Sequence, residues 1–160
     1  MQLSDLITPS RIACNIDAQS KKRALEQVSE LISQDQDTIS STDVFDSLLA
    51  RERLGGTGVG YGVAIPHGRL RNTEQTLGAF VKLRHGVDFD SADHQPVDLV
   101  FALLVPEEST EEHLQALAQL AAMFSNDDFR NKLRQAQTPQ EIHGLLMDWQ
   151  KAINSFAASA

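Results

Sequence analysis

Residues 55–68 read Gly-Gly-Thr-Gly-Val-Gly-Tyr-Gly-Val-Ala-Ile-Pro-His-Gly and contain six of the nine glycines of the chain. A glycine run this dense lets the backbone adopt positive φ angles and approach a ligand closely, and its N–H groups can surround an anion. A short apolar run, 63–65, leads to Pro66 and then to His67. Proline fixes its own φ and favours an extended residue before it, so His67 is expected at a strand end with little freedom. A rigidly held imidazole beside an anion-binding loop suggests phosphate chemistry.

Length and composition are those of one ordinary soluble domain. The 160 residues are 41% hydrophobic and 22% charged, which is enough for a full core. We expect residues 1–153 to form a single domain and residues 154–160 to be a frayed C-terminal tail. The longest apolar run, around 99–106, is too short to span a bilayer, and no secretory signal precedes it. We therefore expect no membrane insertion, and we expect a cytoplasmic location.

Charge and motifs exclude several classes of protein. The formal net charge of −8 argues against nucleic acid and favours a basic protein partner or none. Cys14 is the only cysteine, which excludes an internal disulfide and a cysteine-rich metal site. The dinucleotide, P-loop, zinc-protease and nucleophile-elbow signatures are all missing from the sequence. The phosphate chemistry then needs no nucleotide, other cofactor or metal, and a phosphohistidine is the form that remains.

Apolar periodicity predicts alternating helices and strands. Helices are expected at about 21–34, 43–53, 110–124, 127–134 and 139–152, and strands at about 11–16, 77–83 and 97–105. The last strand is apolar enough to be buried on both faces. Ser41 or Thr42 is expected to cap the second helix, and a capping box at 109–112 is expected to open the third. The buried stripe predicted for this third helix consists of Leu114, Leu117, Ala118, Ala121 and Phe124. The fold class is therefore α/β, with a mixed central sheet flanked by helices on both sides.

Four histidines besides His67 are candidate site residues. His143 has no acidic or histidine partner in the last helix, and we interpret it as structural. His85 and His94 lie in loops among three aspartates, but Ala92 stands where a calcium loop needs an oxygen ligand, so a solvated loop is favoured over a metal site. His113 lies in the first turn of the third helix, where a helix N-terminus favours anions.

His113 and Arg51 each have a structural alternative. Glutamates at 107, 108, 111 and 112 surround His113 in sequence, and they would repel phosphate and stabilise a protonated imidazole. An exposed histidine at a helix start therefore remains open. Arg51 lies in the last turn of the second helix. In the structural alternative its charge complements the helix dipole. In the functional one its guanidinium turns toward an anion held by the glycines, a bidentate role that suits arginine.

At this point a family resemblance becomes visible. The stretch 56–69, the preceding Leu48-Leu49-Ala50-Arg51-Glu52, the run from Pro96 to Pro106 and Glu111-Glu112-His113-Leu114 resemble enzyme IIA proteins of the bacterial phosphotransferase system, fructose/mannitol superfamily. The resemblance covers roughly residues 2–150 in order. The opening 3–12, the segment 20–25 and Val87-Asp88-Phe89-Asp90 are most similar to the nitrogen-regulatory (Ntr) branch, a free-standing regulatory protein, and we expect this chain to be free-standing too.

The resemblance implies a role for each matched residue. His67 would accept a phosphoryl group, on Nε2 in the family, from the phosphohistidine of a small Ntr-type phosphocarrier protein. His113 would hydrogen-bond that group, and Arg51 would neutralise its charge. Apart from the resemblance, the glycine-rich sequence itself predicts that the N–H groups of Gly56, Thr57, Gly58 and Gly60 form a loop that supports the phosphoryl group. The implied function is a phosphohistidine carrier that regulates target proteins according to its phosphorylation state. Two alternatives stay open: a sugar-specific IIA that passes phosphate to a IIB domain, and a binding regulator that is never phosphorylated.

Overall fold

The computed structural model describes residues 2–159, apart from the side chains of Thr110 and Ser159. In chain order the elements are α1 (Leu3–Leu6), the 3-10 helix η1 (Pro9–Arg11), β1 (Ile12–Ile16), α2 (Lys21–Ser33), α3 (Ser41–Leu54), β2 (Gly58–Gly60), β3 (Val63–Ala64), β4 (His67–Leu70), β5 (Leu77–Val87), β6 (Val97–Pro106), α4 (Thr110–Phe124), α5 (Asp127–Gln135) and α6 (Pro139–Ser159). The predicted α/β class is confirmed.

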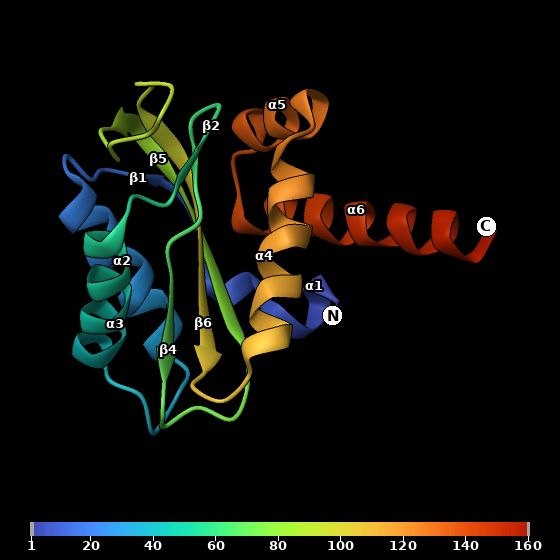
Figure 1. Cartoon of the computed structure of the whole chain (residues 1–160). Helices are drawn as coiled ribbons and strands as arrows, with labels where there is room; N and C mark the ends of the chain where they lie inside the picture. Colours follow the sequence, from blue (N-terminus) through green and yellow to red (C-terminus); the bar gives the residue numbers. More distant parts are fainter. Residues whose placement is uncertain (1, 160) are drawn as a thin grey trace.

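One mixed sheet forms the centre of the molecule. Its strand order is β1-β5-β6-β3-β2. Strand β4 pairs with residues 103–106 of β6, further along this strand than the residues 99–100 that pair with β3. The pairs β1–β5, β3–β6 and β4–β6 are parallel, whereas β5–β6 and β2–β3 are antiparallel. In Figure 1 helices α2 and α3 cover one face of this sheet, and α4, α5 and α6 lie on the other. The prediction of helices on both sides is therefore also confirmed.

The long strand β6 separates two apolar cores. Side chains alternate between the faces of a strand, so Leu99, Phe101 and Leu103 pack with α4, α5 and α6, whereas Val100 and Ala102 pack with α2 and α3. All five side chains are fully buried. This accounts for the nearly continuous apolar run that the sequence shows at this strand. Within residues 2–159, no helix is long and apolar enough to cross a membrane.

Three details of the predicted helices are wrong. Ser40, not Ser41 or Thr42, caps α3, because its side chain accepts a hydrogen bond from the Asp43 N–H. Ser109 makes no capping hydrogen bond through its side chain at the start of α4, so the expected capping box does not form there. Helix α6 continues through Ser159 instead of ending near residue 152, and residues 154–158 are exposed but helical. Met1 and Ala160, the outer ends of the expected domain and tail, lie outside the described residues.

The buried stripe of α4 is also rotated relative to the prediction. Leu114 is 63% exposed, and Ala118 and Ala121 are exposed, whereas His113 and Ala116 are buried. Phe124 is buried as predicted and Leu117 is half-buried, so the prediction is wrong at Leu114, Ala118 and Ala121. The actual stripe follows positions 113, 116, 120, 123 and 124, which recur at helical spacing. Histidine therefore occupies the first position of the buried face of this helix.

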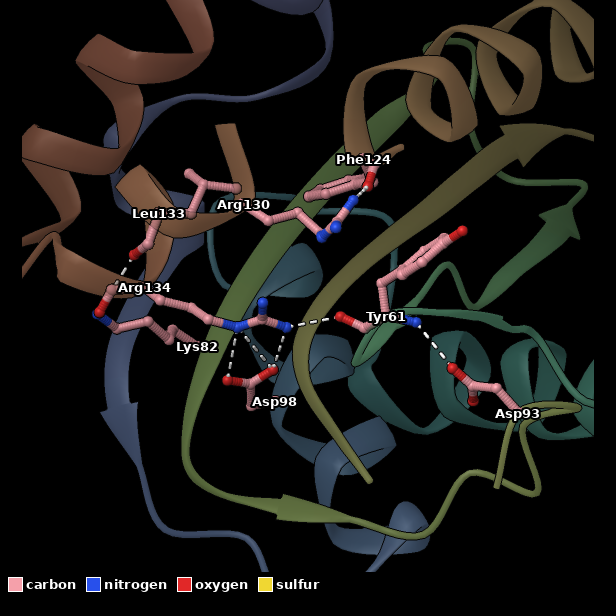
Figure 2. Close-up of polar contacts among 8 residues, drawn as sticks. All are labelled: Tyr61, Lys82, Asp93, Asp98, Phe124, Arg130, Leu133 and Arg134. Atoms are coloured by element: carbon pink, nitrogen blue, oxygen red, sulfur yellow. Dashed lines mark hydrogen bonds and ion pairs between the residues drawn. The ribbon is translucent and has the colours of Figure 1, made fainter. Parts of the chain in front are cut away.

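A polar cluster holds the turn between β2 and β3 against the rest of the fold. We call Tyr61, Asp93, Asp98, Arg130 and Arg134 the Tyr61 clamp (Figure 2). Tyr61 has a φ of 61°; its N–H donates to Asp93 (3.0 Å), and its carbonyl accepts from Nη2 of Arg134 (2.7 Å). Arg134 also forms an ion pair with Asp98 at 3.0 Å, and the Arg130 guanidinium lies 4.4 Å from the centre of the Tyr61 ring. This clamp fixes the turn that precedes β3 and His67.

Candidate active site

The site lies where β4 runs between α3 and α4 (Figure 1). His67 is the first residue of β4 and pairs in register with Leu103 of the central strand. Gly68 lets α3 approach this strand, because a Cβ at position 68 would lie 2.3 Å from Oγ of Ser47. Ser47 in turn donates to the Arg69 carbonyl at 2.9 Å. The strand that presents His67 is therefore held directly against α3, one turn before Arg51.

Hydrogen bonds fix which nitrogen of His67 carries the proton. Nε of Arg51 lies 3.1 Å from Nε2 of His67, and Nδ1 of His67 lies 2.9 Å from the Ile65 carbonyl oxygen. A guanidinium only donates and a carbonyl only accepts, so in the neutral ring Nδ1 carries the proton and Nε2 carries the lone pair. Arg51 is itself held, because its Nη1 donates to the Gly55 carbonyl at 2.8 Å. The ring thus presents Nε2 as a nucleophile toward the arginine side of the cleft.

The imidazole of His113, from α4, packs against that of His67. The two imidazole rings are perpendicular, with centroids 5.1 Å apart. His113 is only 7% exposed, and within the described residues its buried Nδ1 has no hydrogen-bond partner. An unpaired buried polar atom is costly and calls for an explanation. A ligand atom between the two rings would provide one.

Burial and neighbouring cations keep both histidines neutral. Burial lowers the pKa of His113 to about 4, and the charges of His67, Arg69 and Arg51 act in the same direction. Burial also lowers the pKa of His67, although the Ile65 carbonyl opposes this effect. None of the four glutamates near His113 contributes to its pKa shift. The expectation that they would stabilise a protonated His113 is therefore wrong, because the helix turns this imidazole inward, whereas all four glutamates are exposed.

A cleft of about 1120 Å³ opens beside these residues. Arg51, His67, Arg69 and His113 line it, and Leu54 and Leu114 are exposed apolar residues along its walls. Arg69 was not singled out from the sequence. It lies two residues after His67, so both side chains belong to the same face of β4, and within the described residues it forms no ion pair. A basic residue at the second position after a strand-end histidine is the signal that would have found it.

The glycine loop does not take the place that was predicted for it. Thr57 donates its N–H and its hydroxyl to Glu52, at 3.0 and 2.6 Å. Gly56 and Gly58 lie against the loop at 89–91, and Gly60 lies near Asp93. None of Gly56, Thr57, Gly58 and Gly60 lines the cleft. The structure brings His67, His113 and Arg51 together as predicted, but it does not place these four residues around the same point.

The remaining histidines and possible metal ligands lie elsewhere. His85 and His94 are exposed, and His143 is half-buried in α6. The prediction that His85 lies in a loop is wrong, because β5 continues through Val87 and includes it. Among residues 2–159, no group of three or more His, Cys, Asp or Glu side chains is arranged to hold a metal ion. The arrangement at His67 is instead suited to an anionic group, because two imidazoles and three guanidiniums, those of Arg51, Arg69 and Arg71, line one cleft.

Two neutral histidines beside an arginine, on a mixed sheet flanked by helices, are the arrangement that the resemblance to enzyme IIA proteins predicts. Residues 5–149 match the sequence profile described as phosphoenolpyruvate-dependent sugar phosphotransferase system, EIIA 2. The chain belongs to this family.

Relatives with nitrogen-regulatory names cover nearly the whole chain. The nitrogen regulatory protein of Pseudomonas aeruginosa is 43% identical over 150 residues, which are 94% of this chain and 97% of the relative. The crystal structure of nitrogen regulatory protein IIA-Ntr from Neisseria meningitidis superposes with a TM-score of 0.85 at 42% identity, covering 90% and 98% of the two chains. The mannitol IIA of Escherichia coli has a TM-score of 0.74 at 22% identity, covering 88% and 98%, and shares the fold. The predicted resemblance to the nitrogen-regulatory branch is confirmed.

Proposed function

We propose that the chain is a phosphohistidine carrier of a nitrogen-regulatory phosphotransferase system. It accepts a phosphoryl group on Nε2 of His67 from the phosphohistidine of a small Ntr-type phosphocarrier protein. The observation that carries this proposal is the pair of hydrogen bonds at His67. Nδ1–H donates to the Ile65 carbonyl, so the proton stays on Nδ1 and the lone pair of Nε2 is directed toward Arg51. Membership of the EIIA 2 family supports the same chemistry.

In the proposed step, the bond between phosphorus and the donor imidazole breaks while a new bond forms between phosphorus and Nε2 of His67. The donor nitrogen keeps the electron pair of the broken bond. The transition state spreads negative charge over three equatorial oxygens. Donor and acceptor are both imidazoles, so the reaction is close to balance and the protein contributes position and charge.

Each cleft residue then has a task. The Arg51 guanidinium, which now donates to Nε2, turns to the phosphoryl oxygens once that lone pair is used. The ring centroid of His113 lies 5.1 Å from that of His67, and a ring nitrogen of His113 hydrogen-bonds the phosphoryl group. The negative phosphoryl charge beside His113 raises its pKa from the low value of the free form, so His113 becomes a better donor when His67 is phosphorylated.

Phosphorylation also changes what the surface can bind. A phosphohistidine adds roughly the charge of other phosphorylated residues, about −1.5 to −2 near neutral pH, to a chain whose formal net charge is already −8. The charge appears in a cleft bordered by the exposed apolar residues Leu54 and Leu114. We propose that cytoplasmic target proteins distinguish the two forms by this change.

The direct test is His67→Ala mixed with a phosphorylated phosphocarrier, with His143→Ala as the matched control. We expect the wild type and His143→Ala to gain the mass of one phosphoryl group, on Nε2, and His67→Ala to gain none while its thermal unfolding stays unchanged. Normal labelling of His67→Ala would refute the assignment. A wild type that is never labelled would favour the binding regulator instead.

A sugar-specific IIA is the second candidate, and similarity to fructose-specific components is the observation in its favour. The fructose-specific EIIA component of Haloferax volcanii is 38% identical, but over 103 residues that cover 64% of this chain. The nitrogen regulatory protein of Escherichia coli is 41% identical over 149 residues and covers 92%. Transfer of label from phosphorylated His67 to a purified fructose-type IIB domain would favour the sugar-specific function. Selective capture of a cytoplasmic protein by wild type or by His67→Asp, and not by both, would favour the regulatory one.

A further inference from the structure

Glu52 is a buried carboxylate beside the site that the proposed transfer does not use. It is 6% exposed and follows Arg51 in the last turn of α3. A buried carboxylate is costly unless hydrogen bonds satisfy it. Three donors do so here: the N–H of Thr57 at 3.0 Å, the hydroxyl of Thr57 at 2.6 Å and Nζ of Lys21 at 3.3 Å. Glu52 therefore fixes Thr57 by two bonds at once.

From Thr57 a short backbone path leads to the reacting ring. The Thr57 carbonyl accepts a hydrogen bond from the Ile65 N–H at 3.0 Å. The Ile65 carbonyl lies 2.9 Å from Nδ1 of His67. Two consecutive residues of α3 thus act on the two nitrogens of one imidazole: Arg51 contacts Nε2 directly, and Glu52 acts on Nδ1 through Thr57 and Ile65.

The two glycines that flank Thr57 let this segment approach the loop at 89–91. A Cβ at Gly58 would lie 2.1 Å from Oγ of Ser91, so a side chain there would force a shift, and one at Gly56 would lie 3.2 Å from the Phe89 carbonyl oxygen, which is a tight contact. The segment 56–58 therefore packs closely against this loop because position 58 has no side chain. This gives the glycine loop a role that does not involve contact with phosphate.

We infer that Glu52 is a positioning residue for phosphoryl transfer, which acts through Thr57 and Ile65 to keep the His67 proton on Nδ1. The inference rests on the proposed function and deepens it. When Nε2 bonds to phosphorus, Nδ1 keeps its proton and the ring gains positive charge, so the hydrogen bond to the Ile65 carbonyl strengthens in the transition state. The negative charge of Glu52 favours the cationic ring in the same way, since it raises the pKa of His67.

The test compares Glu52→Ala with Glu52→Gln. Both variants lose the ion pair with Lys21, but the amide of glutamine can still accept from the Thr57 N–H and donate to its hydroxyl. The difference between the variants therefore isolates the bonds to Thr57. Asp98→Asn in the Tyr61 clamp is the control for the loss of a paired, half-buried charge elsewhere. Two readouts are compared: the protonation of each His67 ring nitrogen by nitrogen NMR, and the rate of labelling by phosphoramidate, which releases ammonia as its phosphorus bonds to Nε2.

We expect wild type, Glu52→Gln and Asp98→Asn to keep the proton on Nδ1. In Glu52→Ala the two tautomers should mix, and labelling should slow by about 10- to 100-fold, the usual effect of losing an orienting partner. If Glu52→Ala keeps a single Nδ1–H tautomer and the wild-type rate, the inference is wrong. A wild type that phosphoramidate and a phosphorylated carrier both fail to label would instead refute the proposed function, and the tautomer result would still stand.

If Glu52→Ala does not fold, Thr57→Val carries the test. This near-isosteric change removes only the 2.6 Å bond to Glu52 and keeps the N–H that donates to it. A partial shift of the His67 tautomer, with a smaller loss of rate than in Glu52→Ala, would support the inference. A tautomer and rate identical to those of the wild type would overturn it.

Discussion

The His67 cleft and the Tyr61 clamp lie at opposite ends of β3. The polar groups of the clamp are paired, whereas two of those in the cleft are not, within the part of the chain that the structure describes. In the clamp, the N–H and carbonyl of Tyr61 are both bonded, and Arg134 is paired with Asp98. In the cleft, Nδ1 of His113 has no partner and Arg69 has no ion pair within the described residues. Satisfied groups stabilise the fold, whereas unsatisfied buried groups cost free energy unless a substrate completes them. Changes in the cleft should therefore affect transfer, and changes in the clamp should affect stability.

The largest separation is expected for His113→Ala. Losing one positioned donor to the phosphoryl group should slow labelling of His67 by about 10- to 10³-fold. The free energy of unfolding should change by less than about 1 kcal/mol, because removing an unpaired buried nitrogen offsets part of the loss of packing. Rapid-quench labelling and urea unfolding measure the two effects. A labelling rate within twofold of the wild type would make His113 a structural residue.

Acid should destabilise the fold through the same imidazole. His113 binds a proton near pH 6.5 in the unfolded chain but only near pH 4 in the folded one. The unfolded chain therefore holds more protons in this range, and stability falls as the pH decreases from about 6.5 to about 4 and then levels off. The loss should be about 1–3 kcal/mol, the lower values applying where solvent in the cleft screens the ring.

Urea unfolding of wild type and His113→Gln between pH 7.5 and 4 measures this loss. Since glutamine does not titrate, the variant should show a shallower fall. His67, whose pKa is also lowered by burial, should contribute to the slope that remains. Equal slopes for the two proteins would show that His113 titrates normally in the folded chain and would remove the physical basis of its assigned role.

Elements with a clear apolar pattern could be predicted from the sequence. Short strands that form only by pairing with another part of the chain could not. The runs at 77–83 and 97–105 identified β5 and β6 because their side chains fill both cores. Strands β2, β3 and β4 begin inside the glycine stretch and are not predicted as separate strands. They are 2–4 residues long. Strand β2 pairs with β3, and β3 and β4 form through pairing with β6, which lies far from them in the sequence.

The site shows the same division. His67, His113 and Arg51 carry recognisable chemistry, and the predicted trio is together in the structure. The sequence predicts that the glycine loop binds phosphate, because residues without side chains leave their backbone N–H groups accessible to an anion. In the structure, however, the N–H of Thr57 donates to Glu52. Glu52 stands between Arg51 and Arg53 at a charged helix end, and its residue type alone does not distinguish it from an exposed glutamate. Only the fold shows that this carboxylate points inward while the neighbouring Arg51 points into the cleft.

Arg134→Ala should break the clamp and spare the cleft. The change removes the ion pair with Asp98 and the hydrogen bond to the Tyr61 carbonyl. Asp98 is about 30% exposed on its side chain, so the expected loss of stability is about 1–3 kcal/mol, not the cost of a fully buried charge. Labelling of His67 should stay within about twofold of the wild type. A large loss of labelling without a loss of stability would show that the clamp controls His67, and the contrast between the two regions would fail.

The smallest expected effect belongs to Arg69→Gln, and it tests whether an exposed cation contributes to the cleft. The charge of Arg69 lowers the pKa of both His67 and His113, so its removal should raise both. Labelling should slow by only about 3- to 10-fold, because an exposed charge acts through solvent. Arg71→Gln is the matched control, since Arg71 also lines the cleft but is paired with Glu107 at 3.0 Å. Proton NMR titration of the two histidines, with labelling rates at low and high salt, measures the effect. If Arg69→Gln and Arg71→Gln behave alike, the unpaired arginine has no special place in the site, and the cleft depends on Arg51 and His113 alone.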